Sequence, residues 1–238
     1  MKVLAWYYLT MRRSIISRQR SARLILPTTV GAILCVWCAT GVDAQASGYA
    51  RVTFINHGSL YSIVTGQGRL LDPQVFMKSE SAKAGTGLQN IPHAAGVVPV
   101  HLDSPQNMSL YNADGKPLDL TLGQWIRATG TMTATRNGAG SRVVTEFSGL
   151  IAGGSYSLFI ITFNPAGDAY TPADGTGLAN NFTADATGTG AVTVEFPTLL
   201  TDKNAVVLIY HSDGEQHGAE RGAPGITAHD QLAARLPF

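Results

Sequence analysis

The sequence predicts an all-β protein, an antiparallel β-sandwich with long loops and a short helical turn at its C-terminus. Glycine is abundant, with 26 of 238 residues, and threonine, valine and tyrosine recur in short runs between turn residues. That mixture is typical of strands joined by tight turns. In residues 124–136 (QWIRATGTMTATR), apolar and polar side chains alternate with the period of a strand that buries one face. Asn137-Gly138 follows directly and predicts a hairpin turn.

The main sandwich domain is expected to span residues 97–238. Its other strands are predicted from short apolar or alternating runs that turn residues separate. These runs are residues 97–102, 108–111, 142–150, 155–163, 190–196 and 205–210. The most strand-like of them, residues 205–210, is rich in valine and isoleucine. The helical turn is predicted at residues 229–236 (HDQLAARL), which are too few to form a stable helix by themselves.

A smaller N-terminal piece, residues 45–96, is expected to precede this domain. Residues 50–56 (ARVTFIN) alternate, with Val52 and Phe54 on one face, and predict a strand. Residues 60–64 are expected to pair back onto it. Residues 77–96 are the least strand-like part, and we interpret them as a long loop, with or without a helical turn, and as a candidate hinge between the two pieces.

Residues 1–44 have the pattern of an export signal. Five arginines between Arg12 and Arg23 form a basic start, residues 24–40 are mostly apolar, and Val42-Asp43-Ala44 supplies the small residues of a cleavage site. The apolar run is at the short limit for a membrane span, so we expect cleavage and no stable transmembrane anchor. The mature chain is therefore predicted to be periplasmic, at the cell surface or secreted. Arg12-Arg13 leaves both the Sec and the twin-arginine routes open.

Cleavage would change the inventory of charges and thiols. The full chain has 17 basic and 16 acidic residues, and the mature chain would keep 11 basic and 15 acidic residues. Its net charge would be −4 with neutral histidines. Such a balance does not provide the basic surface that nucleic acids require, so no nucleic-acid partner is expected. The only cysteines, Cys35 and Cys38, lie in the apolar run, so the mature chain would have neither a disulfide nor a thiolate ligand.

A series of motifs in residues 145–217 is similar to the copper–zinc superoxide dismutases and related exported Greek-key domains. The motifs are, in order, Gly149-Leu150, Gly153-Gly154, residues 156–163, Asp174-Gly175-Thr176-Gly177, Asn181-Phe182-Thr183-Ala184-Asp185 and residues 206–211. The resemblance implies a Greek-key sandwich. It also implies a strand with two copper-binding histidines, and a later strand that ends in another one.

The chain departs from this family at the residues that bind copper. Phe159 and Ile161 occupy the places of the paired histidines, and no histidine occurs between Leu102 and Tyr210. His211 alone matches a ligand position. A redox copper site needs several fixed imidazoles, so the resemblance supports a fold, and dismutase activity is not expected.

Three of the six histidines, His211, His217 and His229, lie in or beside one glycine-rich stretch after residues 205–210. Imidazole is a good ligand for copper and zinc, and the glycines would let the loop fold back so that the three rings meet around an ion. The alternative is that they are solvated loop histidines, with His229 capping the final helical turn. A calcium site at Asp168, Asp174 or Asp185 is a weaker alternative, because no calcium-loop motif is present.

Two functions of different classes follow. The first is an exported, non-enzymatic sandwich that acts as a surface, matrix or partner-binding module, with an extracellular protein or matrix as partner. The second is a periplasmic or secreted copper- or zinc-binding protein that uses His211, His217 and His229. The sequence leaves enzymatic activity undecided but favours its absence, since no nucleophile motif such as G-x-S-x-G occurs.

Overall fold

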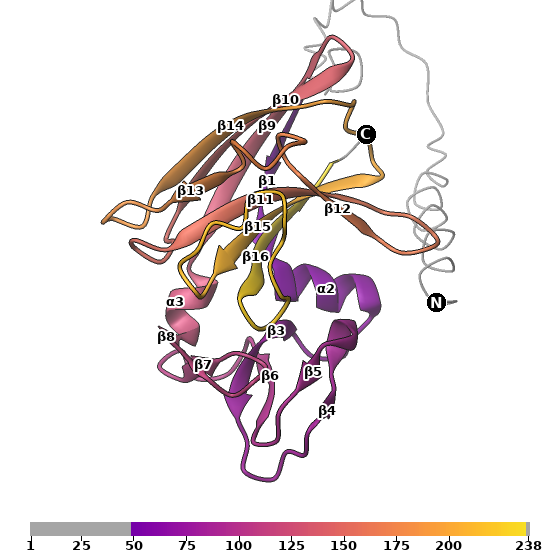
Figure 1. Cartoon of the computed structure of the whole chain (residues 1–238). Helices are drawn as coiled ribbons and strands as arrows, with labels where there is room; N and C mark the ends of the chain where they lie inside the picture. Colours follow the sequence, from indigo (N-terminus) through magenta and orange to yellow (C-terminus); the bar gives the residue numbers. More distant parts are fainter. Residues whose placement is uncertain (1–48, 237–238) are drawn as a thin grey trace, which may run out of the picture. The chain divides into compact units, whose positions relative to one another are not determined.

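The computed structural model describes residues 49–236, which form a largely antiparallel all-β structure with two α-helices (Figure 1). The all-β prediction is therefore confirmed, whereas the Greek-key connection of the strands stays a prediction. These described residues belong to one compact unit. The predicted export signal, residues 1–44, lies outside the described residues. Within those residues, no helix is long and apolar enough to cross a membrane.

The first sheet contains four antiparallel strands. The strand predicted at residues 50–56 pairs with the strand predicted at residues 124–136, and Val52 lies opposite Met132. The hairpin at Asn137-Gly138 is present, since the strands on either side of it pair directly. From one edge to the other, the strands are β1 (Tyr49–Thr53), β9 (Thr129–Asn137), β10 (Gly140–Ser148) and β14 (Gly190–Phe196).

The second sheet contains the most apolar strands, and nearly all residues of its three longest strands are buried. Burial on both faces requires near-continuous apolar runs, which is why residues 205–210 stood out in the sequence. The strand order is β12 (Ala169–Pro172), β11 (Ser155–Thr162), β15 (Asn204–His211), β16 (Ala228–Arg235) and β2 (Ile55–Asn56), with β13 (Asn181–Thr183) pairing with β11.

The hydrophobic core lies between these two sheets. Its side chains come from alternate positions of the facing strands, such as Met132 and Val143 of the first sheet and Leu158 and Leu208 of the second. The opposite face of the second sheet carries a separate apolar cluster, which includes Phe159, Ile161, Val207 and Ile209. Phe159 and Ile161, which the sequence resemblance aligned with copper-binding histidines, are packing residues of this cluster.

A third sheet is grouped with two short helices at one end of the sandwich (Figure 1). Its strands are β6 (Val97–His101), β3 (Leu71–Lys78), β7 (Ser109–Tyr111) and β8 (Pro117–Thr121), and a two-stranded ribbon of β4 (Gly85–Thr86) and β5 (Pro92–His93) lies beside it. The helices are α2 (His57–Thr65) and α3 (Leu122–Ile126), with a 3-10 turn η1 at Leu88–Asn90.

Two predicted strand segments are helical. Residues 60–64 belong to α2: the Asn56 side chain caps its start by accepting a hydrogen bond from the Ser59 amide, and Gly66 ends it in the left-handed conformation. The start of the predicted strand 124–136 belongs to α3, where Thr121 and Gln124 form a capping box. In both places the capping residues outweigh the strand-like composition of the segment.

The predicted helical turn at residues 229–236 is wrong, because this segment is strand β16. It pairs with β15 over nearly its whole length, with one register shift after Leu208, and with β2 on its other side. Helix propensity is a weak preference that tertiary pairing overrides, and here the strand lies between two neighbours in a buried sheet. Residues 77–96, predicted as a loop, hold the whole β4–β5 ribbon and the η1 turn as well as loop.

Gly130 in β9 provides a test of the packing between the sheets. A methyl group at this position would overlap the Phe147 ring and approach Phe54. Gly130→Ala is therefore expected to lower the free energy of unfolding by about 1–3 kcal/mol, the usual cost of overpacking a core. The matched control is Gly68→Ala, where no heavy atom lies within 4 Å. Chemical denaturation of both variants gives the comparison, and equal stabilities would contradict the described packing.

Candidate functional site

His211 is the last residue of β15 and lies against β11, opposite Ser155. Its side chain points to the face of the sheet that carries Val207 and Ile209, since alternate residues of a strand share a face. Only 1% of His211 is exposed. The strand thus fixes the position of one imidazole at the start of the loop 212–227, as expected of a residue that leaves a buried strand.

His217 and Asp213 come from this loop and approach His211. One candidate ligand atom from each of the three residues lies within 4.8 Å of the other two. His217 Nε2 is 3.0 Å from Asp213 Oδ2, and the His211 and His217 ring centroids are 4.9 Å apart. Two imidazoles and a carboxylate form a donor set suited to zinc or copper(II). We call these three residues the His211 group.

The electrostatics of His211 favour the neutral ring. Its pKa is lowered to about 4, mainly by burial and also by the charge of nearby His217, while Asp213 acts in the opposite direction. His211 Nε2 lies 2.7 Å from the Ser157 hydroxyl, whereas the buried Nδ1 atom has no hydrogen-bond partner. A ring that is neutral at physiological pH needs no proton release before it binds an ion.

His229, the third predicted metal ligand, is not in this group. It lies in β16, fully buried, and both of its ring nitrogens have protein partners: Nδ1 is 2.9 Å from the Gln74 carbonyl and Nε2 is 3.1 Å from the Ser212 hydroxyl. Its pKa is lowered to about 4, mainly by burial. The structure therefore brings two of the three predicted histidines together and places Asp213 beside them.

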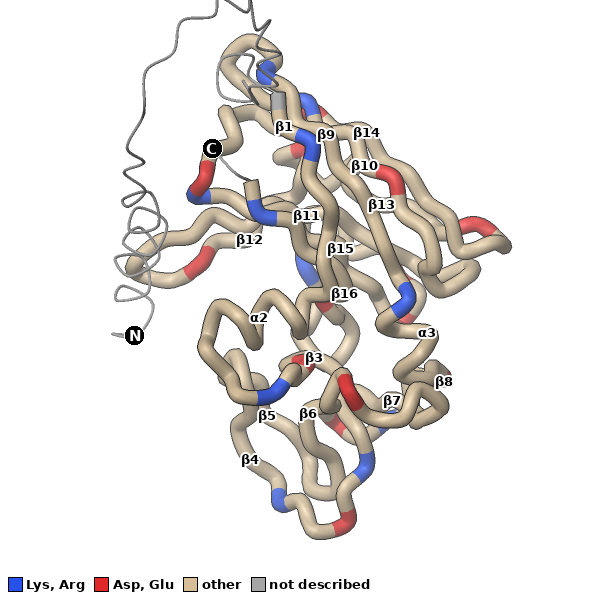
Figure 2. Tube along the Cα trace, turned by 180° about the vertical axis from the view of Figure 1, so that it is seen from behind, with Lys and Arg blue, Asp and Glu red and all other residues tan. Residues whose placement is uncertain are grey.

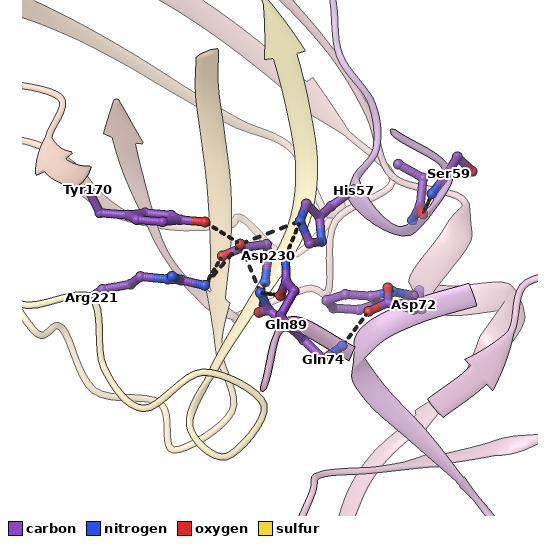
Figure 3. Close-up of polar contacts among 10 residues, drawn as sticks. His57, Ser59, Asp72, Gln74, Gln89, Tyr170, Arg221 and Asp230 are labelled. Carbon is purple, nitrogen blue, oxygen red and sulfur yellow. Dashed lines mark hydrogen bonds and ion pairs between the residues drawn. The ribbon is translucent and has the colours of Figure 1, made fainter. Parts of the chain in front are cut away.

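A second cluster of polar residues surrounds Asp230, the neighbour of His229 in β16. The Asp230 carboxylate is fully buried and accepts hydrogen bonds from Arg221 at 3.0 and 3.2 Å, from Gln74 at 2.9 Å and from Tyr170 at 3.3 Å. His57 Nε2 is 3.7 Å from the same carboxylate. Figure 3 shows Tyr170 and Arg221 reaching Asp230 from one side and His57 from the other. We call this set, completed by Gln89, the Asp230 cluster.

The Asp230 cluster fixes the middle of the loop 212–227. The Arg221 guanidinium lies 3.8 Å from the centroid of the Tyr170 ring and forms an ion pair with Asp230. Gln89 closes the cluster from η1, where it receives a 2.8 Å hydrogen bond from Gln74 and holds a left-handed backbone at φ +54°. A non-glycine residue in this conformation is strained and persists only where its surroundings hold it.

Asp72 extends the buried polar region towards the third sheet. Its carboxylate accepts hydrogen bonds from the Gln74 amide at 2.9 Å and from the Trp125 indole at 2.9 Å. Burial raises the pKa of Asp72, while the charge of His57 and these hydrogen bonds act against the increase. Trp125 also contacts His229 edge-on, with ring centroids 6.4 Å apart.

Two of the three aspartates of the calcium alternative, Asp174 and Asp185, accept several hydrogen bonds from the chain itself. The Asp174 carboxylate accepts hydrogen bonds from the amides of residues 176–179 and from the Thr176 hydroxyl. Although burial opposes it, these hydrogen bonds hold the pKa of Asp174 well below its usual range. Asp185 binds the Thr187 and Thr189 amides in the same way. Both aspartates therefore act as turn-forming residues.

Comparison with known proteins gives no relative: neither a family model nor a curated protein matches this chain. The function is therefore inferred from the residues of the site alone. Sequence reasoning identified His211 and His217, but it grouped them with His229 and did not name Asp213 as a ligand. Asp213 could have been identified from its position two residues after the strand, where it shares the first turn of the loop with His211.

Acid titration tests the buried histidines. The pKa of His211 and of His229 is about 4 in the folded chain, against an ordinary value of 6.5. Between these values the unfolded chain binds more protons, so the free energy of unfolding falls as pH drops from 6.5 to 4, by about 3 kcal/mol per histidine at most. Asp72 acts in the opposite direction, because its raised pKa favours the folded state as pH falls.

Replacement of His211 separates these contributions. His211→Asn is expected to flatten the pH dependence of stability between pH 6.5 and 4. The control is Ser141→Ala, which removes a buried hydroxyl that does not titrate and should shift the whole curve without changing its slope. Urea unfolding at half-unit pH steps gives the curves. Parallel curves for the wild type and His211→Asn would contradict the lowered pKa.

Proposed function

We propose that the chain is a metal-binding protein that holds zinc or copper(II) at His211, Asp213 and His217. The observation that carries this proposal is the convergence of one buried imidazole and two loop ligands to within 4.8 Å. Tetrahedral coordination with bonds of about 2.0–2.1 Å places ligand atoms about 3.3 Å apart, so a small contraction of the loop would complete the site. Three protein ligands would leave one position for water or another donor.

Preorganisation supports the same proposal. His211 is fixed by the sheet, and the loop is fixed further along by Arg221 on Asp230. Asp213 and His217 lie between these two anchors, so little loop entropy is lost when they close on an ion. The donor set contains nitrogen and oxygen, which favours zinc and copper(II) over copper(I), an ion that prefers sulfur ligands.

A second candidate is the partner-binding module. The loop 174–179 is ordered by the hydrogen bonds to Asp174, and it carries Leu178 with 90% of its surface exposed. A rigid loop with an apolar tip loses little entropy on contact with a partner. Figure 2 shows lysine and arginine dispersed along the described chain, which favours a protein or matrix partner over a polyanion.

Thermal melting with and without metal distinguishes the two candidates. At pH 7.5, Zn²⁺ or Cu²⁺ at 100 times its dissociation constant should stabilise the wild type by about 2.7 kcal/mol, because the ion binds the native state alone. His211→Ala, Asp213→Ala and His217→Ala should each reduce the increase in Tm. His229→Ala should lower the Tm of the metal-free chain but retain the increase.

The matched control for the melting series is His101→Ala, which removes a histidine from β6 in the third sheet. It should retain the full increase in Tm. An increase that survives in the His211→Ala variant would contradict the proposed ligand set. Identical melting curves with and without metal would leave the partner-binding module as the better proposal.

Export is part of the same proposal and is supported by the sequence of residues 1–44. The expected outcome is a mature chain that begins near Gln45 and is found in the periplasm, at the cell surface or in the medium. N-terminal sequencing of protein recovered from each fraction of its native cell measures this. A soluble cytoplasmic form that retains Met1 or Met11 would contradict it.

A further inference from the structure

Ser157 is the residue in closest polar contact with the buried imidazole of His211. It lies in β11, where its partner in β15 is Ile209, and Ser155 pairs with His211. Ser157 and His211 are therefore diagonal neighbours on one face of the sheet, a separation that side chains bridge. The Ser157 hydroxyl oxygen is 2.7 Å from His211 Nε2, and both residues are only 1% exposed.

This contact decides which ring nitrogen of His211 is available to bind an ion. Nε2 is occupied by Ser157, whereas Nδ1 is buried without a partner. If Ser157 donated its proton to Nε2, the ring would carry its hydrogen on Nδ1, and a buried N–H would have no acceptor. Such unpaired donors are rarer in proteins than unpaired acceptors. The tautomer with hydrogen on Nε2 instead leaves a lone pair on Nδ1.

We propose that Ser157 is a positioning residue of the metal site: its hydroxyl accepts a hydrogen bond from His211 Nε2 and thereby commits Nδ1 to the ion. This inference rests on the proposed metal-binding function. A ring nitrogen opposite the metal-bound one commonly donates a hydrogen bond, which fixes the tautomer and the ring orientation. Ser157 provides such an acceptor from a buried strand, so its geometry does not depend on the loop.

The surroundings of His211 agree with an ion at Nδ1. Asp213 and His217 each place one candidate ligand atom within 4.8 Å of a His211 ring nitrogen. The Asp213 carboxylate accepts a hydrogen bond from His217 Nε2, at 3.0 Å, whereas His211 Nδ1 has no hydrogen-bond partner. A cation among the three ligand atoms would pair with the unused Nδ1 lone pair and with the carboxylate together.

The tautomer is measured directly in metal-free protein. Long-range proton–nitrogen correlation spectra of the imidazole rings, with His211 assigned from a His211→Asn sample, distinguish the two neutral forms. The expected result is hydrogen on Nε2, and addition of Zn²⁺ should then perturb Nδ1 most. Hydrogen on Nδ1 in the metal-free chain, or coordination through Nε2, would overturn the inference.

Substitution of Ser157 measures the effect on metal binding. Ser157→Ala should weaken Zn²⁺ binding by about 10–100-fold, the usual effect of removing a residue that orients a ligand. Ser157→Thr keeps the hydroxyl and should restore most of the affinity. The matched control is Ser141→Ala: Ser141 is a buried serine of β10 whose hydroxyl accepts a hydrogen bond from the Leu200 amide at 2.9 Å, and its loss should leave the affinity unchanged.

The two proposals fail in different ways. If the wild-type chain binds neither Zn²⁺ nor Cu²⁺, the proposed function fails, and the metal-free tautomer still decides whether Ser157 accepts the Nε2 hydrogen. If the wild type binds metal and Ser157→Ala binds it equally well, with the tautomer unchanged, the positioning role of Ser157 is wrong while the metal site stands.

Discussion

The buried carboxylate of Asp230 is the constraint on which the rest of the structure depends. Burial of a charged carboxylate costs several kcal/mol unless partners replace its water. In this chain the partners come from β3, β12 and the loop 212–227, and they contribute Gln74, Tyr170 and Arg221. Segments far apart in sequence must therefore meet at one point. Removal of any one of these partners would leave the carboxylate less well compensated at the junction of the sandwich and the third sheet.

Gln74 is the residue that makes this junction specific. Its side chain accepts a hydrogen bond from the Asp230 amide at 2.8 Å and donates to the Asp230 carboxylate, while its carbonyl lies 2.9 Å from His229 Nδ1. A fully buried glutamine that makes all these contacts fixes the position of β16 relative to β3. Polar networks of this kind impose one arrangement, because any shift leaves a buried group unpaired.

Sequence patterns predicted most of the sandwich because its strands carry their own signals. Residues 205–210 are apolar throughout, and Asn137-Gly138 specifies a hairpin, so β15 and the β9–β10 pair could be expected from local chemistry alone. The strand β16 could not, since residues 229–236 contain good helix formers, and only pairing with β15 and β2 makes them a strand. The caps at Asn56 and Thr121 were readable signals for α2 and α3, but the strand-like composition around them obscured both.

The candidate site shows the same division between local and long-range information. His211 follows directly from a buried strand, so its fixed position was predictable. Ser157 lies 54 residues earlier in the chain and reaches His211 only through the pairing of β11 with β15. His229 was grouped with the metal ligands because it is near in sequence, yet the pairing of β16 turns it towards Gln74 and Ser212.

The loop 212–227 contributes to two polar groups, the Asp230 cluster and the His211 group. Arg221 is committed to the Asp230 cluster, where its charge is matched and Tyr170 covers its face. Asp213 pairs with His217 and accepts a hydrogen bond from the Glu215 amide, and both Asp213 and His217 keep about a quarter of their side-chain surface exposed. The loop is thus held at one end by the ion pair between Arg221 and Asp230, and at its other end it carries ligand atoms that lie close together around His211. An ion that supplies the missing partner for His211 Nδ1 would complete the second end without disturbing the first, because Arg221 and the β15–β16 pairing already hold the loop in place.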